Sequence, residues 1–398
     1  MKPDILITRP VSIPDAIRVS RYAKNPELGP RILFFSGGSA LNDVARKLKN
    51  YTHNAIHLVT PFDSGGSSAV IREHFNMPAV GDIRSRLMAL ADETALGHPD
   101  INRLFEYRFD KAASNADLLQ RLQSMIGCTD ELTKDIANPM QTIIVNQLQY
   151  FVDAMPDTFD LRGASIGNLV LVGGYLNQGR QLDPSIFLFS ELINAKGIVR
   201  AITEDNYHLA AVLADGTQVL GQHQLTGKER PPISSPIRKL KLTKDLDSLS
   251  PVRSNLEPHN KTLISEAELI CYPPGSFYTS LAANLLPYGV AEAIANNPAP
   301  KVYIPNRGHD PEQHGMSLAD QIDTLITRLQ GQFDHPVAPD RLLNFVLIDD
   351  KDVIKNAQID EAELESMGIQ IIRTCLTKQM YDPIYDSHKL VETLMSLV

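Results

Sequence analysis

The sequence predicts an α/β fold, with a Rossmann-like, mostly parallel sheet flanked by helices, a helical insert and additional β/α elements. Short apolar runs typical of buried parallel strands alternate with segments of helical periodicity along most of the 398 residues. The first two runs, residues 31–36 (RILFFS) and 55–60 (AIHLVT), are joined by a glycine turn and a helical segment. This order predicts a βαβ unit with a right-handed crossover.

The first helix follows Gly37 and Gly38, which end the first strand. Its apolar residues recur at helical spacing, at Leu41, Val44, Ala45 and Leu48. After the second strand, residues 61–68 (PFDSGGSS) predict a loop and residues 69–75 a short helix. Gly81-Asp82 opens a longer helix, for which Asp82 is the predicted N-cap.

The middle of the chain is less regular. Residues 110–160 predict a helical insert, and residues 165–176 (SIGNLVLVGGYL) form a glycine-rich segment. Residues 197–225 alternate like strands and hairpins, with Asp215-Gly216 as a turn. Residues 227–260, rich in Pro, Ser and Lys, predict a linker or surface insert.

The last third returns to alternating strands and helices. Predicted strands cover residues 268–272, 301–304, 344–348 and 369–374, and predicted helices cover residues 280–286, 318–328, 359–367 and 386–397. We therefore expect an extension at 1–30 with a short strand at 5–8, a main α/β domain at 31–330, and β/α elements at 331–398 packed on that domain.

Composition narrows the class of protein. Hydrophobic residues make up 43% and charged residues 21%, which excludes a disordered or fibrous chain. No apolar run approaches the length of a membrane helix, and the net charge of −9 argues against a dedicated nucleic-acid binder. The three cysteines lie far apart and form neither a disulfide framework nor a zinc site. These features predict a cytoplasmic protein.

Two glycine loops follow the first two strands. Ser36-Gly37-Gly38-Ser39 offers backbone N–H groups that suit phosphate, although a tight turn without a ligand explains the same residues. The second loop runs from Asp63 through Ser64, Gly65, Gly66 and Ser67 to Ser68. Its carboxylate and hydroxyls suit an anion with Mg²⁺ held by Asp63, or an Asx turn that binds only backbone. Both loops are expected at one sheet edge, where ligands of open α/β sheets bind.

Three further segments carry candidate residues. Arg84, with Arg72 and Arg86 nearby, suits a bidentate phosphate contact or simple solvation. Gly167-Asn168 is one candidate, and the loop after residue 272, which contains Gly275, Ser276, Tyr278 and Ser280, is another. This second loop repeats the strand-to-helix pattern, with Tyr278 either beside a base or sugar or packed at the helix start. Residues 306–314 (NRGHDPEQH) offer His309, Asp310 and His314 as metal ligands, but a polar loop explains them better.

Taken in order, five motifs resemble one family. FFSGGSALNDVARKLK, VTPFDSGGSSAVIR, AVGDIRSRLMALAD, SIGNLVLVGGYL and ELICYPPGSFYTSLAANLL are similar to those of the CofD/YvcK family, over roughly residues 31–330. The family contains 2-phospho-L-lactate transferases of coenzyme F420 biosynthesis and YvcK-type proteins associated with UDP-sugar binding. The resemblance implies a nucleotide-binding α/β domain at 31–330.

The resemblance also implies a reaction. A phospho-lactyl or enolpyruvyl-type group would pass from a nucleoside-diphosphate-linked donor to an acceptor hydroxyl, with Mg²⁺ assisting and nucleoside monophosphate leaving. The alternatives are a regulator that binds a UDP-sugar without turnover and a catalytically silent scaffold. The implied partner is a nucleotide-linked small molecule of GDP or UDP type, with no nucleic acid and no membrane, and a homodimer suits a chain of this size.

The motifs transfer residue by residue. Asp63 becomes the catalytic and metal-binding residue, and the nucleotide or phosphate site comprises Ser36, Gly37, Gly38, Ser39, Ser64, Gly65, Gly66, Ser67, Ser68, Arg84, Gly167, Asn168, Gly275, Ser276, Tyr278 and Ser280. The chain departs from the family pattern in the second loop. Ser64 replaces the second acidic residue and Ala69 replaces a glycine, so a metal ligand is missing from this motif.

Overall fold

The computed structural model describes residues 10–227, 230–352, 359–379 and 382–398. Its centre is a seven-stranded sheet in the order β11-β10-β9-β8-β1-β2-β3, and every pairing in it is parallel. The strands are β1 (Ile32–Ser36), β2 (Ile56–Val59), β3 (Ile198–Ala201), β8 (Leu269–Tyr272), β9 (Lys301–Tyr303), β10 (Phe345–Asp349) and β11 (Gln370–Thr374). The predicted α/β fold is confirmed.

The strand order reverses at β1. The chain runs from β1 to β2 and β3 on one side, then crosses back to β8 and continues to β9, β10 and β11 on the other. Two neighbouring strands whose connections leave in opposite directions leave a crevice between their carboxyl ends. The topology therefore places a ligand crevice between the loops that follow β1 and β8.

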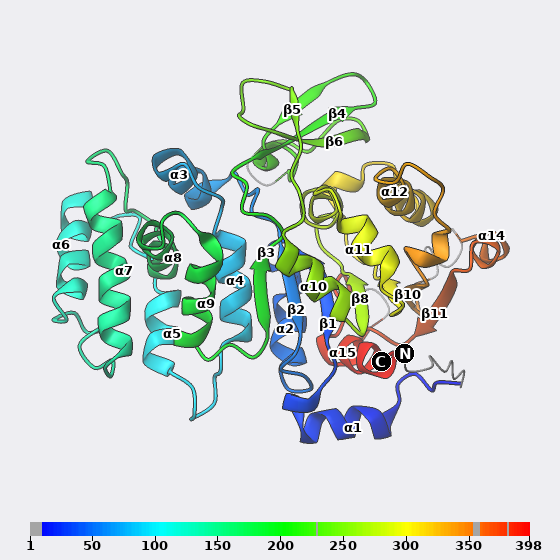
Figure 1. The fold of residues 1–398 in the computed structure, drawn as a ribbon, viewed down its shortest axis with the longest axis horizontal. Coiled ribbons are helices and arrows are strands. Elements are labelled where there is room, and N and C mark those ends of the chain that lie inside the picture. The colour runs from blue at the N-terminus through cyan, green and yellow to red at the C-terminus, as the bar shows by residue number, and fades with distance from the viewer. Residues whose placement is uncertain (1–9, 228–229, 353–358, 380–381) are drawn as a thin grey trace.

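Helices cover both faces of this sheet (Figure 1). A further group of helices extends beyond the β3 edge of the sheet. The helices of the described residues are α1 (Ala16–Lys24), α2 (Asn42–Leu48), α3 (Gly66–Phe75), α4 (Gly81–Leu90), α5 (Pro99–Glu106), α6 (Asn115–Ile126), α7 (Met140–Ala154), α8 (Ile166–Asn177), α9 (Leu182–Leu192), α10 (Pro258–Glu266), α11 (Val290–Asn296), α12 (Leu318–Gln330), α14 (Glu361–Ser366) and α15 (Ser387–Ser396). A six-residue π-helix, Phe277–Ala282, follows β8.

Each face of β1 serves a different core, because side chains alternate along a strand. Ile32 and Phe34 pack in the cluster that contains residues of α1, α2 and α15. Leu33 and Phe35 pack in the cluster formed with α10, α11 and α12. A third core is formed by the series of helices from α3 through α9, which extends beyond the β3 edge of the sheet. It contains the predicted helical insert.

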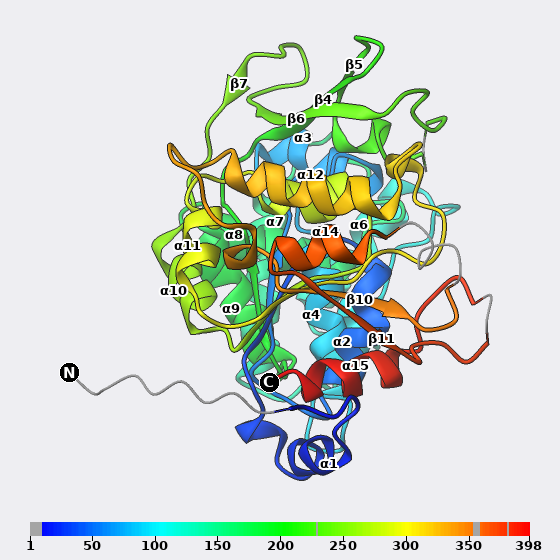
Figure 2. The same ribbon diagram turned by 90° about the vertical axis from the view of Figure 1, so that its right-hand side faces the viewer.

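Residues 227–260, predicted as a linker or surface insert, contain regular secondary structure. They contain β6 (Ile237–Thr243), β7 (Pro251–Val252) and the start of α10, and they join β4 (His208–Leu213) and β5 (Gln218–Leu220) in an antiparallel sheet ordered β5-β4-β6-β7. The sequence did not predict β6 because its lysines resemble those of a solvated segment. In the structure Ile237, Leu240 and Leu242, which alternate with these charged residues, are buried. The small sheet stands at the opposite end of the molecule from α1 and α15 (Figures 1 and 2).

The predicted extension at 1–30 is partly helical. The suggested strand at 5–8 lies outside the described residues, whereas α1 packs against α15. Arg18 Nη1 donates to the carbonyl oxygen of Ser396 at 3.0 Å, and the backbone N–H of Asp15 donates to the Ser396 hydroxyl at 2.8 Å. Within the described residues, no helix combines the length and apolarity that a membrane crossing needs.

Candidate functional site

A cavity of about 470 Å³ lies at the carboxyl ends of β1, β2 and β8. It brings together most of the residues that the sequence predicted for a site, namely Ser36, Gly37, Gly38, Ser39, Asp63, Gly65, Gly66, Ser67, Ser68, Arg84, Asn168, Gly275, Ser276 and Ser280. Ser64, Gly167 and Tyr278 do not line it. Segments more than 200 residues apart in sequence thus meet at the crevice that the topology creates.

The loop after β1 presents backbone N–H groups to this cavity. No hydrogen-bond partner for the N–H groups of Gly37, Gly38 and Ser39 is found among the described residues. Gly37 also permits a close approach to the β8 side, because a methyl group on its Cα would lie 2.3 Å from Ser280 Oγ. The loop therefore offers free donors at a point where a larger residue would collide with its neighbour.

A buried arginine holds this loop from behind. Arg86 is fully buried, and its Nη2 donates to the carbonyl oxygens of Gly38 at 3.2 Å and Gly37 at 3.4 Å. Burial lowers the pKa of Arg86 to about 10, while Asp82 nearby opposes that shift. Arg86 therefore does not contact a ligand directly, as the sequence suggested it might, but engages the loop's carbonyls while its N–H groups remain free for the cavity.

The loop after β2 is held in the same way. Arg72 Nη1 donates to the carbonyl oxygens of Phe62 and Asp63, both at 3.3 Å, and its Nη2 donates to the carbonyl oxygen of Tyr207 at 2.7 Å. Burial lowers the pKa of Arg72 to about 10. This arginine also joins the small sheet to the loop, so its role is to position the loop rather than to bind phosphate.

Asp63 and the start of α3 form the cavity side of this second loop. Asp63 Oδ1 accepts the backbone N–H of Gly65 at 3.1 Å, which is the Asx turn that the sequence left open. Gly66 has φ +46°, in the left-handed region that favours glycine. The N–H groups of Gly66 and Ser67, in the first turn of α3, have no partner among the described residues and suit an anion.

Ser64 turns away from the cavity. Its hydroxyl lies 2.9 Å from His223 Nδ1 and accepts the backbone N–H of His223 at 3.2 Å. His223 follows β5, so this contact fixes the small sheet above the β2 loop. The serine that replaces an acidic residue of the family pattern therefore has a structural contact of its own.

A second carboxylate nevertheless reaches the cavity. Asp82 is not the N-cap of α4, because the helix begins at Gly81 and Val80 occupies the N-cap position. Asp82 lines the cavity with Asp63, and a methyl group on Gly38 would lie 3.5 Å from Asp82 Oδ1, while one on Gly81 would lie 3.7 Å from Asp63 Oδ2. Two carboxylates on one wall, together with phosphate and water oxygens, suit Mg²⁺.

Asp63 and Asp82 are not part of a larger cluster of metal-binding side chains among the described residues. Within the described part of the chain, no set of three or more His, Cys, Asp or Glu side chains converges to hold a metal ion. The alternative that His309, Asp310 and His314 form such a site is therefore not supported. Any Mg²⁺ in the cavity would depend on oxygens of the ligand as well as on Asp63 and Asp82.

Two arginine side chains line one wall of the cavity, one from α4 and one from the segment after α5. Arg84 and Arg108 both border the cavity, and the pKa of Arg84 is lowered to about 10 by burial and by the charge of Arg108. Gly167 makes room for Arg84, because a methyl group there would lie 2.9 Å from Arg84 Cδ and 2.7 Å from the Phe105 carbonyl oxygen. Gly167 therefore acts through packing, and its neighbour Asn168 reaches the cavity.

The loop after β8 differs from the first two. Four of its N–H groups are occupied by side-chain oxygens of the 306–314 segment. Asp310 Oδ2 accepts the N–H of Phe277 at 2.8 Å, and Glu312 Oε2 accepts those of Tyr278 at 2.9 Å and Thr279 at 2.8 Å. The Gly275 N–H donates to Asn306 Oδ1 at 2.8 Å. This loop contributes hydroxyls from Ser276 and Ser280, but these four N–H groups are not available to a ligand.

Tyr278 packs in the core instead of beside a base or sugar. Its ring is buried, its hydroxyl donates to the carbonyl oxygen of Ile237 at 3.2 Å, and the Arg328 guanidinium lies 5.1 Å from its ring centre. Burial raises the pKa of Tyr278. The packing alternative that the sequence left open is the one that the structure shows.

Sequence reasoning missed Arg108 and three residues that line the cavity from the segment after β5, namely Gln222, His223 and Thr226. No local motif marks them.

A second, more apolar cavity of about 400 Å³ adjoins the first at Ala40, Thr226 and Pro274–Ser276, and Pro311, Pro383 and Ile384 line it. The carboxyl edge of the sheet thus carries a polar cavity with an apolar extension.

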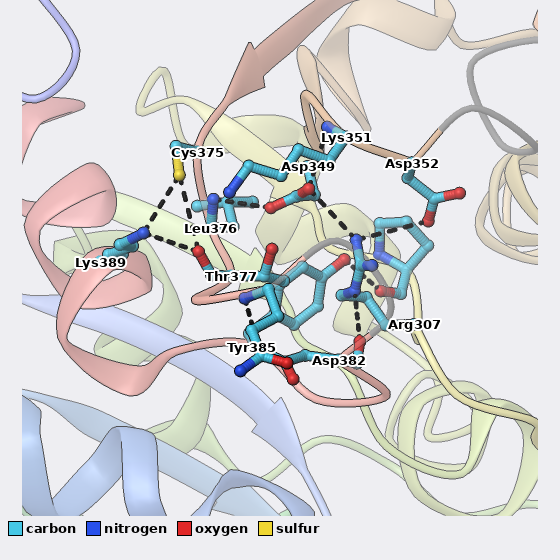
Figure 3. Close-up of polar contacts among 12 residues, drawn as sticks. Arg307, Asp349, Lys351, Asp352, Cys375, Leu376, Thr377, Asp382, Tyr385 and Lys389 are labelled. Atoms are coloured by element: carbon cyan, nitrogen blue, oxygen red, sulfur yellow. Dashed lines mark hydrogen bonds and ion pairs between the residues drawn. The ribbon is translucent and has the colours of Figure 1, made fainter.

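A separate polar cluster ties the segments after β9, β10 and β11 to α15 (Figure 3). Arg307 pairs with Asp349 at 3.4 Å, and Asp349 Oδ2 accepts the N–H of Leu376 at 2.8 Å. Lys389 Nζ donates to Cys375 Sγ at 3.1 Å and to the Thr377 carbonyl oxygen at 2.6 Å. These groups engage one another, which assigns the cluster a structural role.

Known proteins resemble this chain along nearly its whole length. The family described as "2-phospho-L-lactate transferase CofD" matches residues 32–377. The "Gluconeogenesis factor" of Bacillus subtilis (strain 168) is 26% identical over 383 residues, covering 93% of this chain and 98% of that protein. A "Putative gluconeogenesis factor" of Thermoanaerobacterium thermosulfurigenes is 28% identical over 375 residues, covering 93% and 97%.

A solved structure shares the fold. The crystal structure of a UPF0052-family protein from Bacillus halodurans matches with a TM-score of 0.65 and 22% sequence identity, covering 92% of this chain and 98% of that one. This likeness concerns the fold alone. It agrees with the parallel sheet and its flanking helices described above.

Proposed function

Because the chain belongs to the family described as 2-phospho-L-lactate transferase CofD, we propose that it transfers a phospho-lactyl or enolpyruvyl-type group from a nucleoside-diphosphate-linked donor to an acceptor hydroxyl, with release of nucleoside monophosphate. One observation carries the proposal. The free N–H groups of the β1 and β2 loops, the Asp63–Asp82 pair and two arginines line a single cavity at the reversal of strand order.

In this proposal the diphosphate lies between the first two loops. The N–H groups of Gly37–Ser39 and of Gly66 and Ser67 donate to its oxygens, and Arg84 and Arg108 neutralise its charge. The base would lie in the apolar extension beside Pro311 and Pro383. Phosphoryl transfer requires little covalent chemistry from a protein, so these positioned donors and charges would supply most of the acceleration.

Asp63 and Asp82 are the residues that would hold Mg²⁺. Bound there, the ion would neutralise charge on the transferred phosphoryl group and on the departing monophosphate. Asp82 would supply the carboxylate that Ser64 no longer provides, so the departure from the family pattern in the second loop is compatible with a metal-assisted reaction.

A second candidate is a regulator that binds a nucleotide sugar without turnover. The relatives named as gluconeogenesis factors favour it, since that name describes an effect on metabolism rather than a transfer reaction. The same cavity and the same diphosphate contacts would serve this function. The two candidates therefore differ in turnover and not in the geometry of binding.

Calorimetry with GDP, UDP and UDP-N-acetylglucosamine, with and without Mg²⁺, tests both candidates. We expect Mg²⁺-dependent binding that is weakened about tenfold or more in Asp63→Asn and in Asp82→Asn. Asp323→Asn, a change of an exposed carboxylate on α12, is the matched control and should bind as the wild type does. These substitutions preserve side-chain shape and change only the charge.

Turnover then separates the candidates. Release of nucleoside monophosphate from a GDP- or UDP-linked lactyl donor, in the presence of a deazaflavin acceptor, supports the transferase. Saturable binding without release supports the regulator. If none of the nucleotides binds at millimolar concentration, both candidates fail and the silent scaffold is left.

A further inference from the structure

The proposed function leaves the imidazole of His223 in the main cavity without a task. His223 lies in the 3₁₀-helix Gln222–Gln224 after β5 and lines the cavity. Two contacts fix it to the loop after β2, because the Ser64 hydroxyl lies 2.9 Å from His223 Nδ1 and accepts the backbone N–H of His223 at 3.2 Å. The same loop carries Asp63 and leads into the free N–H groups at the start of α3. The ring is therefore anchored to the loop to which the proposed function assigns the diphosphate and Mg²⁺.

The Nδ1 edge of the ring faces the protein and not the cavity. Nδ1 contacts Ser64, and a methyl group on Gly221 would lie 2.9 Å from Cε1 and 3.0 Å from Nδ1 of His223. Neither Ser64 nor Gly221 lines the cavity, whereas His223 does. The opposite edge, which carries Nε2, therefore borders the cavity. Nε2 has no hydrogen-bond partner among the described residues, and it retains accessible surface.

Attachment of the small sheet does not explain this ring. The backbone N–H of residue 223 already donates to Ser64, and any side chain at this position would keep that bond. The Ser64 hydroxyl can accept from Nδ1–H, which leaves the lone pair of Nε2 for a proton, and it continues to accept after Nε2 is protonated. A ring nitrogen held by an orienting partner, with the second nitrogen open to a cavity, is the arrangement expected of a general base.

The other ionisable side chains of the cavity cannot supply this base in the proposed function. Asp63 and Asp82 would hold Mg²⁺, and Arg84 and Arg108 are cations without a lone pair to accept a proton. The transfer needs a proton acceptor, because the acceptor hydroxyl must lose its proton as its oxygen bonds to phosphorus. Among the described residues that line the cavity, the imidazole of His223 is the base that remains.

We propose that His223 is the general base of the transfer and that Ser64 is its positioning residue. The inference rests on the proposed function. Nε2 takes the proton of the acceptor hydroxyl while the hydroxyl oxygen forms a bond to the phosphorus of the transferred group. The bond from that phosphorus to the nucleoside monophosphate breaks, and its electron pair stays on the monophosphate oxygen. The imidazolium then releases its proton to water, which restores the base.

Turnover and binding, measured separately, test the role of His223. His223→Asn keeps a polar group near the position of Nδ1, where it can contact Ser64, and removes Nε2. We expect kcat for release of nucleoside monophosphate from the GDP- or UDP-linked lactyl donor, with the deazaflavin acceptor, to fall about 100-fold or more. The Kd of GDP or UDP with Mg²⁺ should change less than about twofold by calorimetry, which also shows that the variant is folded. His335→Asn, a change of an exposed histidine after α12, is the matched control and should leave kcat and Kd unchanged.

Ser64→Ala tests the positioning role. It removes the contact to Nδ1 and leaves Nε2 in place, so kcat should fall about tenfold while the Kd of the nucleotide stays the same. Ser64→Thr restores a hydroxyl and should recover most of the lost kcat. If Ser64→Ala lowers the free energy of unfolding and leaves kcat unchanged, the contact is structural alone and Ser64 is not a positioning residue.

Three results overturn the assignment of His223, and they bear differently on the proposed function. If the wild type releases monophosphate and His223→Asn does so at nearly the same kcat, His223 is not the base and the proposed function survives. A variant that keeps its kcat and binds GDP or UDP more weakly leads to the same conclusion, since the ring would then bind the ligand without taking a proton. If the wild type releases no monophosphate from either donor, the proposed transfer has failed and this inference fails with it.

Discussion

The loops after β1 and β8 lie side by side at one edge of the sheet, yet they are held in opposite ways. Arg86 holds the β1 loop by donating to its carbonyl oxygens, which leaves the N–H groups of Gly37–Ser39 without a partner among the described residues. Asp310 and Glu312 hold the β8 loop by accepting its N–H groups. The first arrangement leaves three consecutive donors for a ligand, whereas the second uses the N–H groups of Phe277, Tyr278 and Thr279 within the protein.

This difference teaches that glycine and serine between a strand and a helix do not by themselves make an anion site. Both loops carry that pattern. What distinguishes them is where each backbone N–H finds its acceptor, because a group already paired inside the protein contributes nothing further to binding. The β2 loop belongs with the β1 loop, since Arg72 also binds carbonyl oxygens.

Removing the Glu312 side chain should have the largest effect on this arrangement. Glu312→Ala would leave two buried N–H groups and the Thr279 hydroxyl without an acceptor and would open a cavity beneath the π-helix. We expect a loss of about 3–5 kcal/mol in the free energy of unfolding, measured by urea denaturation.

Glu312→Gln is the matched control, because it retains a carbonyl oxygen for the N–H groups. It should lose about 1–2 kcal/mol. Equal losses in the two variants would show that the carboxylate fills space rather than holding the loop. Wild-type stability in Glu312→Ala would contradict the hydrogen bonds described here.

The buried carboxylate also predicts a pH dependence. Burial and the charge of Asp310 raise the pKa of Glu312 from 4.5 to about 7. Between these values the folded protein keeps a proton that the unfolded chain has lost, so its stability falls as the pH rises from 4.5 toward 7. This group would contribute a decrease of up to about 3 kcal/mol across that window.

Denaturation at several pH values in this window measures the effect. The dependence should flatten in Glu312→Gln, which cannot titrate. A wild-type profile that rises over the same range, or one that Glu312→Gln leaves unchanged, would contradict the raised pKa. The Arg72 and Arg86 guanidiniums stay charged throughout, so the loops that they hold should not contribute to this dependence.

Most of the large sheet could be predicted from the sequence, because its strands are short continuous apolar runs between glycine turns. β1, β2 and β8 therefore appear within a residue or so of their predicted places. β6 could not be predicted in the same way. Its lysines resemble a solvated segment, and only its pairing with β4 shows which residues are buried.

The site residues also divide into those that local motifs predict and those that only the folded topology brings together. Asp63, Gly37 and Gly38 belong to local motifs and could be located from sequence alone, and so could Arg84. The carboxylate of Glu312 lies 33 residues from the Thr279 hydroxyl that it binds, and Ser64 is separated from His223 by 159. Contacts made over such separations depend on the folded topology, so no local spacing predicted that the β8 loop would be closed by its own chain.

Arg86→Met gives the smallest expected change in stability and the sharpest test of the comparison. The substitution removes a buried guanidinium that has no ion pair within hydrogen-bond distance among the described residues. Relief of the desolvation of this charge offsets most of the cost of leaving two carbonyl oxygens without their donor. We expect a change of less than about 1 kcal/mol in the free energy of unfolding. The carbonyls of Gly37 and Gly38 would then lose their donor, and the loop's N–H groups would no longer be held toward the cavity. Nucleotide affinity should fall about tenfold by calorimetry, whereas Arg103→Met, on the exposed face of α5, should leave it unchanged. Undiminished affinity in Arg86→Met would mean that the glycine loop keeps its shape without the arginine, and the contrast with the β8 loop would then rest on the carboxylates alone.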